Sequence, residues 1–555
     1  MKPLLTLHDP VQARAYHRAG LWSDDGFYAL LAAHAAARPD AFAARDGVRR
    51  VSWQQLQAWV DVVAARLHRA GVDRGERVSL WASNRLEVVV AFLACCRNGY
   101  VCNPSLHQNY TGQEVLGLLD RIGTTALLVE AGYGAAGAGA VLAAAAALPQ
   151  MRQVLTLPTA RETGDGFPPL PDIADDADGD LPPPVAGADK VCYLAFTSGT
   201  TGQPKGVMHS DNTLLANARD LVRDWGHDGD TVLLSLSPLS HHIAWVALAQ
   251  ALVAGAEFVV NDPPDGATAL DWIVASGATY VMGVPTHAMD IQAEQRQRGL
   301  ARLGAVRVFY MAGSPIPPAV AEAFVAQGIT PQNVYGMTEN SSHQYTHPDD
   351  DAARITATCG RGGRAYEVRI FDRENADRAL PPGSIGQIGG RGAALMLGYF
   401  DNQAATEQSF NRDGWFLSGD LGVLDDAGHL AIVGRLKDMI IRGGHNIHPA
   451  RIEDLAVKHA GVAKAAVFPV ADERLGEKVC LAVLADDATP PAAGALLDHL
   501  HAAGLSIYDM PEYFIVLDDL PLTASGKILK RELAAWVRDG RLRPQPVRFV
   551  APEKR

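Results

Sequence analysis

The sequence is poor in cysteine. Six cysteines are spread over 555 residues, and no two of them form a CxxC pair. A small disulfide scaffold and a zinc ribbon are excluded, because each needs denser or more regularly spaced cysteines. Only Cys95, Cys96 and Cys102 lie close together, and no histidine stands at metal-ligand spacing among them. We therefore expect ordinary reduced thiols.

The sequence also lacks a leader-like start and a long apolar run. Residues Met1 to Pro10 contain neither an apolar stretch nor a small-residue cleavage site. No uninterrupted run reaches the roughly 20 apolar residues that a membrane-spanning helix needs. The most apolar tract, Ala138 to Leu148, is rich in alanine and is typical of a helix in a water-soluble protein. We expect a cytoplasmic protein without stable membrane insertion.

A net positive charge is absent as well. The chain carries 49 Lys and Arg against 62 Asp and Glu, which gives a formal net charge of −13. A chain this acidic repels a nucleic-acid backbone, so nucleic acid is not expected as a partner. Any phosphate-binding site must therefore be local.

What is present indicates an α/β protein. A chain of 555 residues is too long for one core, so we expect a large part and at least one further domain. Helical and strand-like patterns alternate through the first 435 residues, which is typical of βαβ units and mainly parallel sheets flanked by helices. The predicted helices include Phe27–Ala37, Trp53–Ala70 and Leu86–Cys96, and the predicted strands are Arg77–Trp81, Ala126–Glu130, Val191–Phe196, Thr231–Ser237, Glu257–Val260, Thr279–Met282 and Val306–Met311.

The pattern changes near Gly434. Residues Gly414 to Val433 are typical of a hairpin, and a compact α+β pattern of three helices and three strands follows, with the last helix starting at Gly526. We place the boundary at Arg435–Lys437, which gives a large domain at 1–435 and a smaller, mobile domain at 436–555. Residues Gly164 to Pro184 are rich in Pro, Asp and Gly and are expected to form a surface connector.

The segment with the strongest chemical signal is Tyr193–Gly206. A buried strand leads into a loop of Thr, Ser and Gly and then into Lys205. Glycines let backbone N–H groups curl around an anion, hydroxyls add donors, and the lysine adds positive charge. The spacing is not that of a Walker A loop, because Pro204 precedes the lysine. The segment is expected to bind phosphate at the end of a strand, where α/β proteins bind ligands.

Five segments in order resemble the motifs of one family. Thr197–Val207 (TSGTTGQPKGV) is similar to the signature loop of the ANL superfamily, which comprises acyl- and aryl-CoA synthetases, peptide-synthetase adenylation domains and luciferases. The resemblance spans nearly the whole chain. The other four segments are Tyr335–Glu339 (YGMTE), Gly414–Asp420 (GWFLSGD, with Ser418 where Thr is usual), Gly434–Ile447 around the hinge, and Pro521–Lys527 (PLTASGK).

The resemblance implies an ATP-dependent ligase. Such an enzyme activates a carboxylic acid as an acyl-AMP with release of pyrophosphate, and then passes the acyl group to coenzyme A. The implied cofactors are ATP, Mg²⁺ and coenzyme A, and a homodimer is the default oligomer. The implied ligand of Mg²⁺ is Glu339, since Mg²⁺ favours one or two carboxylates beside the phosphates. The residues implied to bind nucleotide or coenzyme A are Thr197, Ser198, Gly199, Thr200, Thr201, Gly202, Lys205, Gly313, Ser314, Tyr335, Gly336, Thr338, Asp420, Arg435, Lys437, Gly443, Gly444 and Asn446.

The physical chemistry of these residues agrees with such roles. The ring of Tyr335 suits a flat base, and the carboxylate of Asp420 can accept two hydroxyl hydrogen bonds from a ribose. Arg435 is implied to join Asp420. Lys205 and Lys527 are the implied catalytic cations; Lys527 would hold the reacting carboxylate and the α-phosphate together as charge shifts.

The small domain is implied to turn between the two half-reactions. Lys437 would be the hinge, and the Gly443–Gly444 loop would then leave room for the thin pantetheine arm. Some aryl-CoA ligases carry a second lysine in this loop, where this chain has Ile441. How the thioester half-reaction is assisted therefore stays open.

The acid pocket carries a weaker signal. The resemblance implies a gating aromatic residue or histidine near 238–245, and we favour His241 over His242. Amino-acid-activating relatives need an aspartate here, and this stretch has none. The other expected lining segments are apolar or small, so the substrate tail is predicted to be neutral. Cyclic or aromatic carboxylates and medium-chain fatty acids are the leading classes.

Several other interpretations remain. Residues Gly132–Gly137 fit GxGxxG after a strand, as in a nicotinamide-dependent oxidoreductase, but Thr156 to Asp165 resembles a loop, so the acidic residue expected at the end of a second strand is missing. Within the family, the thiol could belong to a carrier-protein pantetheine. A nucleotide-binding relative without activity is disfavoured by the presence of all five charged motif residues, and nothing in the sequence indicates luciferase-like oxidation.

Overall fold

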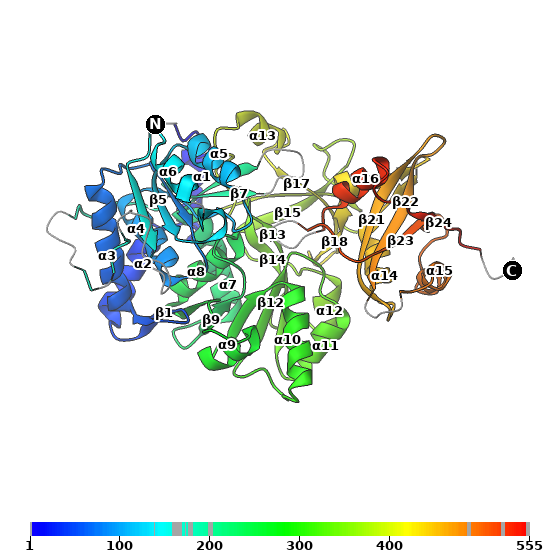
Figure 1. Cartoon of the computed structure of the whole chain (residues 1–555), viewed down its shortest axis with the longest axis horizontal. Coiled ribbons are helices and arrows are strands. Elements are labelled where there is room, and N and C mark those ends of the chain that lie inside the picture. The colour runs from blue at the N-terminus through cyan, green and yellow to red at the C-terminus, as the bar shows by residue number, and fades with distance from the viewer. Residues whose placement is uncertain are drawn as a thin grey trace. The chain divides into compact units, whose positions relative to one another are not determined.

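The computed structural model describes residues 3–137, 139–157, 169–172, 174–175, 181–197, 204–443, 445–485, 490–522 and 528–550. Figure 1 shows the chain coloured from its N-terminus to its C-terminus. Its contacts divide it into two compact units. The first unit comprises Met1–Val368, Gly390–Phe410 and Ala427–Leu430, and the second comprises Arg369–Gly389, Asn411–Asp426 and Ala431–Arg555. Each unit is described by itself.

Two sheets organise the first unit. The strands pair in parallel except for the antiparallel pairs β7–β8, β13–β14 and β1–β2. The six-stranded sheet has the order β6 (Gln153–Leu157), β5 (Thr124–Glu130), β3 (Arg77–Trp81), β4 (Val101–Asn103), β7 (Val191–Thr197) and β8 (Lys205–Ser210). The eight-stranded sheet has the order β14 (Ser341–Tyr345), β13 (Thr330–Met337), β12 (Val308–Ala312), β11 (Tyr280–Gly283), β9 (Val232–Ser235), β10 (Glu257–Val260), β1 (Phe42–Arg45) and β2 (Arg50–Ser52).

Helices cover both faces of each sheet. On β5, Ala126 and Leu128 belong to the central apolar cluster, whereas Leu127 and Val129 belong to another on the opposite face, as the two-residue period of a strand requires. The central cluster takes α2 (Phe27–Ala37), α3 (Trp53–Arg69), α4 (Leu86–Asn98), α7 (Asp211–Trp225) and α8 (His242–Ala254). One outer cluster includes residues of α5 (Gly112–Ile122) and α6 (Gly139–Ala146). The other includes residues of α9 (Ala269–Ser276), α10 (Pro285–Gln297) and α11 (Pro318–Val325).

Short helices complete the first unit, and a four-stranded sheet belongs mostly to the second unit. The helices are α1 (Pro10–Arg18), α12 (Ala352–Ala357) and α13 (Gln403–Gln408). The four strands lie in the order β15 (Tyr366–Phe371), β16 (Gly386–Gly392), β17 (Phe416–Leu424) and β18 (Leu430–Arg435). Strands β17 and β18 are neighbours, as expected for the predicted hairpin.

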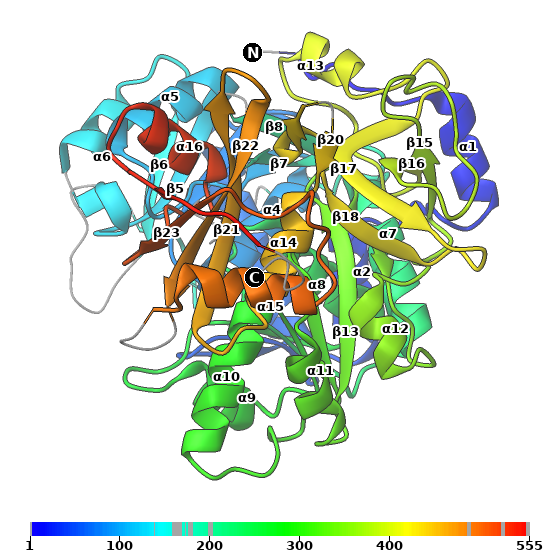
Figure 2. The same cartoon turned by 90° about the vertical axis from the view of Figure 1, so that its right-hand side faces the viewer.

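The second unit contains a smaller α+β arrangement after residue 435. Its long hairpin pairs β21 (Val462–Asp472) with β22 (Gly476–Ala485) from Val462–Ala485 to Asp472–Gly476. The helices α14 (Pro449–Ala456) and α15 (Ala493–Ala502) share one apolar cluster with the sheet, and α16 (Lys530–Arg538) packs on another (Figure 2). The other strands are β19 (Ile440–Arg442), β20 (His445–Ile447), β23 (Tyr513–Leu517) and β24 (Gln545–Pro546).

The predicted fold class is confirmed, with one error in the strand assignment. Helix α2 and strands β3 and β10 have the predicted bounds. Thr156 does not begin a loop, because it lies inside β6, which pairs in parallel with β5. A second strand therefore does follow the Gly132–Gly137 loop. Much of the predicted connector at 164–184 lies outside the described residues. The boundary at Arg435–Lys437 stays a prediction.

Among the residues that the structure describes, no helix is both long and apolar enough to cross a membrane.

Candidate active site

The predicted phosphate loop connects two antiparallel strands. Strand β7 ends at Thr197 and β8 begins at Lys205, and these two residues are cross-strand partners. The side-chain hydroxyl of Thr197 donates to the carbonyl of Lys205 over 3.5 Å. The loop residues Ser198, Gly199, Thr200, Thr201 and Gly202 lie outside the described residues. The β7–β8 pairing nevertheless fixes where the loop leaves and re-enters the sheet.

A tyrosine that the sequence analysis did not predict joins Lys205 to Glu339. The ammonium nitrogen of Lys205 lies 4.6 Å from the centroid of the Tyr399 ring, a cation–π distance. The hydroxyl of Tyr399 donates to Oε1 of Glu339 over 2.9 Å. Both Tyr399 and Glu339 are buried. Two residues predicted from separate motifs therefore share one neighbour, which no local sequence signal marked.

The Tyr335–Glu339 motif forms the end of β13 and the turn into β14. The register shifts between Tyr335 and Met337, which marks an irregularity in the hairpin. A Cβ atom on Gly336 would lie 1.8 Å from the carbonyl oxygen of Ser341, so only glycine fits at this position. The ring of Tyr335 is partly exposed, as a base-stacking surface must be.

A buried histidine holds the main chain of this motif. His209 donates from Nε2 to the carbonyl of Thr338 over 2.6 Å, and its Nδ1 lies 2.9 Å from the hydroxyl of Thr213. Burial lowers the pKa of His209 to about 4, so the ring is neutral at pH 7. A neutral imidazole that donates from Nε2 has an unprotonated Nδ1, which can only accept a hydrogen bond. His209 was not predicted, since it lies inside a strand rather than in a motif.

His242 belongs to the same buried region. Its ring stacks on His209 at 5.5 Å between centroids, and its nitrogens lie 3.0 Å from the Ser341 hydroxyl and 3.3 Å from the Tyr193 hydroxyl. Burial lowers the pKa of His242 well below its usual value. The ring of His242 is thus held in place by His209 and by two hydroxyls. The sequence alone could not distinguish its surroundings from those of its neighbour His241.

The favoured gating residue, His241, has a different environment. It stands before the first turn of α8, partly exposed, and its ring lies 4.6 Å from that of His107. Nδ1 of His107 lies 3.0 Å from the Ser240 hydroxyl, and burial lowers the pKa of His107 to about 4. His107 itself is therefore uncharged at pH 7. The first unit also contains a cavity of about 410 Å³, which is lined by Ser83, Asn84, Gln108, Glu130, Ala131, Gly132, Tyr133 and Pro238.

Two further predicted residues stand at a strand end in the first unit. Gly313 and Ser314 follow β12 directly, and both are exposed. Gly313 has a φ of +93°, a conformation that favours glycine. They lie at the carboxyl end of a parallel strand, where ligands bind in α/β sheets.

In the second unit, Asp420 and Arg435 form an ion pair. Nε of Arg435 lies 3.1 Å from Oδ1 of Asp420, and the Asp420 side chain is only 11% exposed. Ser418, which replaces the usual threonine, accepts from the Asp420 backbone N–H over 3.1 Å and donates to the carbonyl of Ile388 over 2.9 Å. The serine hydroxyl is therefore enough to fix the main chain that carries the aspartate.

The hinge and C-terminal motifs are described only in part. Lys437 lies in the short helix η2 (Leu436–Asp438), where burial and then the Arg435 charge lower its pKa. Gly443 has a φ of +57°, and Asn446 pairs with Ile441 across β19 and β20. Gly444 and Lys527 lie outside the described residues.

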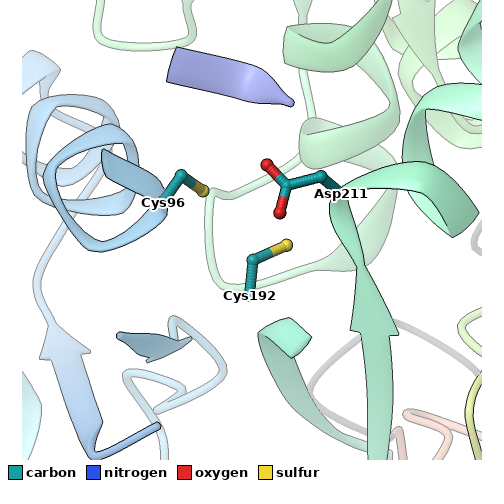
Figure 3. Close-up of side chains that lie close together, drawn as sticks. All are labelled: Cys96, Cys192 and Asp211. Atoms are coloured by element: carbon teal, nitrogen blue, oxygen red, sulfur yellow. The ribbon is translucent and has the colours of Figure 1, made fainter. Parts of the chain in front are cut away.

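A compact group of metal-ligating residue types lies in the core of the first unit. The ligand atoms of Cys96, Cys192 and Asp211 are within 4.8 Å of one another, and Figure 3 shows the three side chains pointing toward a common centre. However, Nζ of Lys190 already donates to Oδ2 of Asp211 over 2.8 Å, and the backbone N–H of Phe27 donates to Oδ1 over 3.0 Å. Burial raises the pKa of Cys96 to about 11 and that of Cys192 well above its usual value. Protonated thiols and an ion-paired carboxylate do not favour a metal.

The family comparisons agree with this arrangement. The model of the "AMP-binding enzyme" family matches residues 31–400, which include the Gly132–Gly137 loop, and that of the "AMP-binding enzyme C-terminal domain" matches residues 451–527. The chain is 30% identical over 539 residues to the medium-chain fatty-acid–CoA ligase of Escherichia coli (strain K12), covering 96% of this chain and 93% of that protein. It is 31% identical to the 2-hydroxy-7-methoxy-5-methyl-1-naphthoate–CoA ligase of Streptomyces carzinostaticus, covering 95% and 96% of the two chains.

A solved structure shows the same architecture. The crystal structure of ATP-bound MatB from Rhodopseudomonas palustris superposes with a TM-score of 0.81 at 28% identity, covering 93% of this chain and 99% of that chain. The predicted resemblance is confirmed by these findings. The chain therefore belongs to the family of AMP-binding, adenylate-forming enzymes and is an acid–thiol ligase that uses ATP.

Proposed function

We propose that this ligase activates a carboxylic acid with an uncharged tail as an acyl-AMP and then transfers the acyl group to free coenzyme A. The observation that carries the proposal is the linked arrangement of Lys205, Tyr399 and Glu339. A cation and a carboxylate are held at one ring, and the cation stands on the first residue of β8. That is the charge pattern a metal–triphosphate complex needs.

The residues present fit Mg²⁺. Glu339 offers hard carboxylate oxygens, which Mg²⁺ prefers. The Tyr399 hydroxyl donates to one of these oxygens, and metal-binding carboxylates usually accept such a hydrogen bond. When bound, Mg²⁺ would neutralise phosphate charge. Glu339 would hold the ion, and Lys205 would lie near the phosphates.

The remaining residues would orient the nucleotide and the acid. Tyr335 would stack on adenine, and Asp420, held by Arg435, would accept hydrogen bonds from the ribose hydroxyls. The acid's carboxylate would attack the α-phosphorus, while Lys527 balances the charge that develops as pyrophosphate leaves. Turning of the small domain about Lys437 would then let the thiol attack the acyl-AMP carbonyl, with AMP as the leaving group. The roles of Lys527 and Lys437 stay predictions from the family resemblance.

The neutral tail is supported by the electrostatics beside His241. His107 is uncharged at pH 7 because its pKa is about 4, so it cannot balance a second carboxylate on the substrate. The two relatives named above are ligases of a medium-chain fatty acid and of a naphthoic acid, both of which have largely apolar tails. Aromatic, alicyclic and medium-chain acids are therefore the classes to test.

The test is formation of AMP and of thioester from ATP and a panel of aromatic, alicyclic, fatty and dicarboxylic acids, with and without coenzyme A. We expect thioester with at least one monocarboxylic class and none with dicarboxylic acids. Acyl-AMP that accumulates without a coenzyme A adduct would reject free coenzyme A and favour a carrier-protein thiol. Turnover of dicarboxylic acids alone would reject the neutral tail.

A further inference from the structure

We propose that Tyr399 is a positioning residue with two separable functions: its hydroxyl orients the Glu339 carboxylate toward a bound metal, and its ring holds the Lys205 ammonium beside the nucleotide phosphates. The inference rests on the proposed function, because it assigns Tyr399 to the site that the function requires. It adds a third participant to a pair of residues that belong to different motifs.

The hydroxyl contact is short and shielded. Tyr399 is 5% exposed and Glu339 is 9% exposed, and their side chains meet at 2.9 Å. A phenol has a single proton to donate, and here that proton goes to Oε1 of the carboxylate. Donation to one carboxylate oxygen restricts rotation of the whole group, and it thereby sets the direction in which the group can bind a cation.

The ring contact concerns a different atom of the same side chain. Nζ of Lys205 lies 4.6 Å from the ring centroid, where the negative face of an aromatic ring attracts a cation. This contact does not need the hydroxyl. Replacing Tyr399 by phenylalanine should therefore remove the support of Glu339 and keep that of Lys205, whereas an aliphatic residue should remove both.

The backbone around Tyr399 prevents the ring from shifting. The segment 396–400 is hydrogen-bonded to β8, which begins with Lys205, and also to Glu339. The N–H of Tyr399 itself donates to the hydroxyl of Thr406 over 3.0 Å. The other bonds run from Leu397 N to Met208 O (2.8 Å), from Met208 N to Gly398 O (3.1 Å), from Phe400 N to Gly206 O (2.7 Å) and from Met396 N to Glu339 O (2.7 Å).

The experiment compares metal binding with metal-free nucleotide binding in the full-length protein. Mn²⁺ serves as a paramagnetic probe for Mg²⁺, and its binding to the complex with a non-hydrolysable ATP analogue is followed by electron paramagnetic resonance. Calorimetry with the same analogue in a chelator gives the metal-free affinity. The variants are Tyr399→Phe, Tyr399→Leu and a matched control, Tyr345→Phe, whose buried hydroxyl donates to the Asp224 carboxylate over 2.7 Å.

We expect Tyr399→Phe to weaken Mn²⁺ binding about tenfold, the loss usual for a residue that supports a metal ligand, and to leave metal-free nucleotide affinity unchanged. Tyr399→Leu should weaken both, and Tyr345→Phe neither. Equal Mn²⁺ affinity in Tyr399→Phe and Tyr345→Phe would overturn the inference, and the phenylalanine variant alone suffices if the leucine variant does not fold. A wild-type protein that binds no metal–nucleotide complex would overturn the proposed function itself, which is a distinguishable result.

Discussion

The ion pair between Asp420 and Arg435 allows a prediction that separates stability from function. We consider Asp420→Asn, which keeps the shape of the side chain and removes its charge. The pair is partly exposed, since the Arg435 side chain is 38% accessible, so solvent screening limits its contribution to stability to about 0.5 kcal/mol. The backbone bond from Asp420 to Ser418 does not involve the carboxylate and should persist.

The expected loss of nucleotide binding is larger. A hydrogen bond to a charged group contributes about 1.5–3 kcal/mol, so replacing the carboxylate that we propose as the ribose ligand should weaken ATP binding roughly 10- to 150-fold. Calorimetry would give the affinity for ATP, and urea unfolding would give the stability. Asp426→Asn is the matched control, because Asp426 is exposed in the turn between β17 and β18. An Asp420→Asn protein that binds ATP like the wild type would refute the assigned role, whatever its stability.

Three further predictions test other parts of the structure. Burial lowers the pKa of His209 to about 4 from its ordinary 6.5, so below pH 6.5 the unfolded chain binds a proton that the folded chain does not. Stability should therefore fall as the pH drops from 6.5 to 4, by about 2 kcal/mol at pH 5 from this residue alone. A urea midpoint that is constant from pH 7 to pH 5 would contradict this. Gly336→Ala should cost more than about 3 kcal/mol of stability, because the added Cβ would lie 1.8 Å from the Ser341 carbonyl oxygen. Gly117→Ala is the control and should cost nothing, because the space around Gly117 is open. Equal melting temperatures of the two variants would show that the hairpin tolerates the clash. Dialysis against a chelator should leave the melting temperature unchanged, because Lys190 already pairs with Asp211. Stoichiometric zinc in the purified protein, measured by elemental analysis, would instead show that the Cys96–Cys192–Asp211 group binds metal.

The sequence was most informative where the signal is local. The apolar runs at Arg77–Trp81 and Glu257–Val260 predict buried parallel strands with the observed bounds, because a strand buried on both faces needs no other information. Strand β6 was missed because its five residues are followed at once by Pro158 and a polar, glycine-containing stretch, so the segment resembles a loop. Only its pairing with β5 reveals it.

The motif residues of the candidate site could be predicted from the sequence, whereas the residues that contact and orient them could not. Lys205, Glu339 and Asp420 each stand in a segment whose composition indicates chemistry. Tyr399 and His209 do not, because their significance comes from contacts with residues that are distant in the chain, 60 residues away for Tyr399 and Glu339 and 129 for His209 and Thr338. Local patterns do not encode such contacts, which depend on how the strands pair.

The backbone bonds between segment 396–400 and the start of β8 have a consequence for recombining this enzyme with its relatives. A chimera with a crossover anywhere between residues 210 and 390 inherits the strand that begins with Lys205 from one parent and the segment that carries Tyr399 from the other. The two pieces must still form the hydrogen bonds that join residues 206 and 208 to residues 397, 398 and 400. We therefore expect that exchanging residues 205–208 and 396–400 as one block preserves these bonds, and with them the positions of Lys205 and Tyr399.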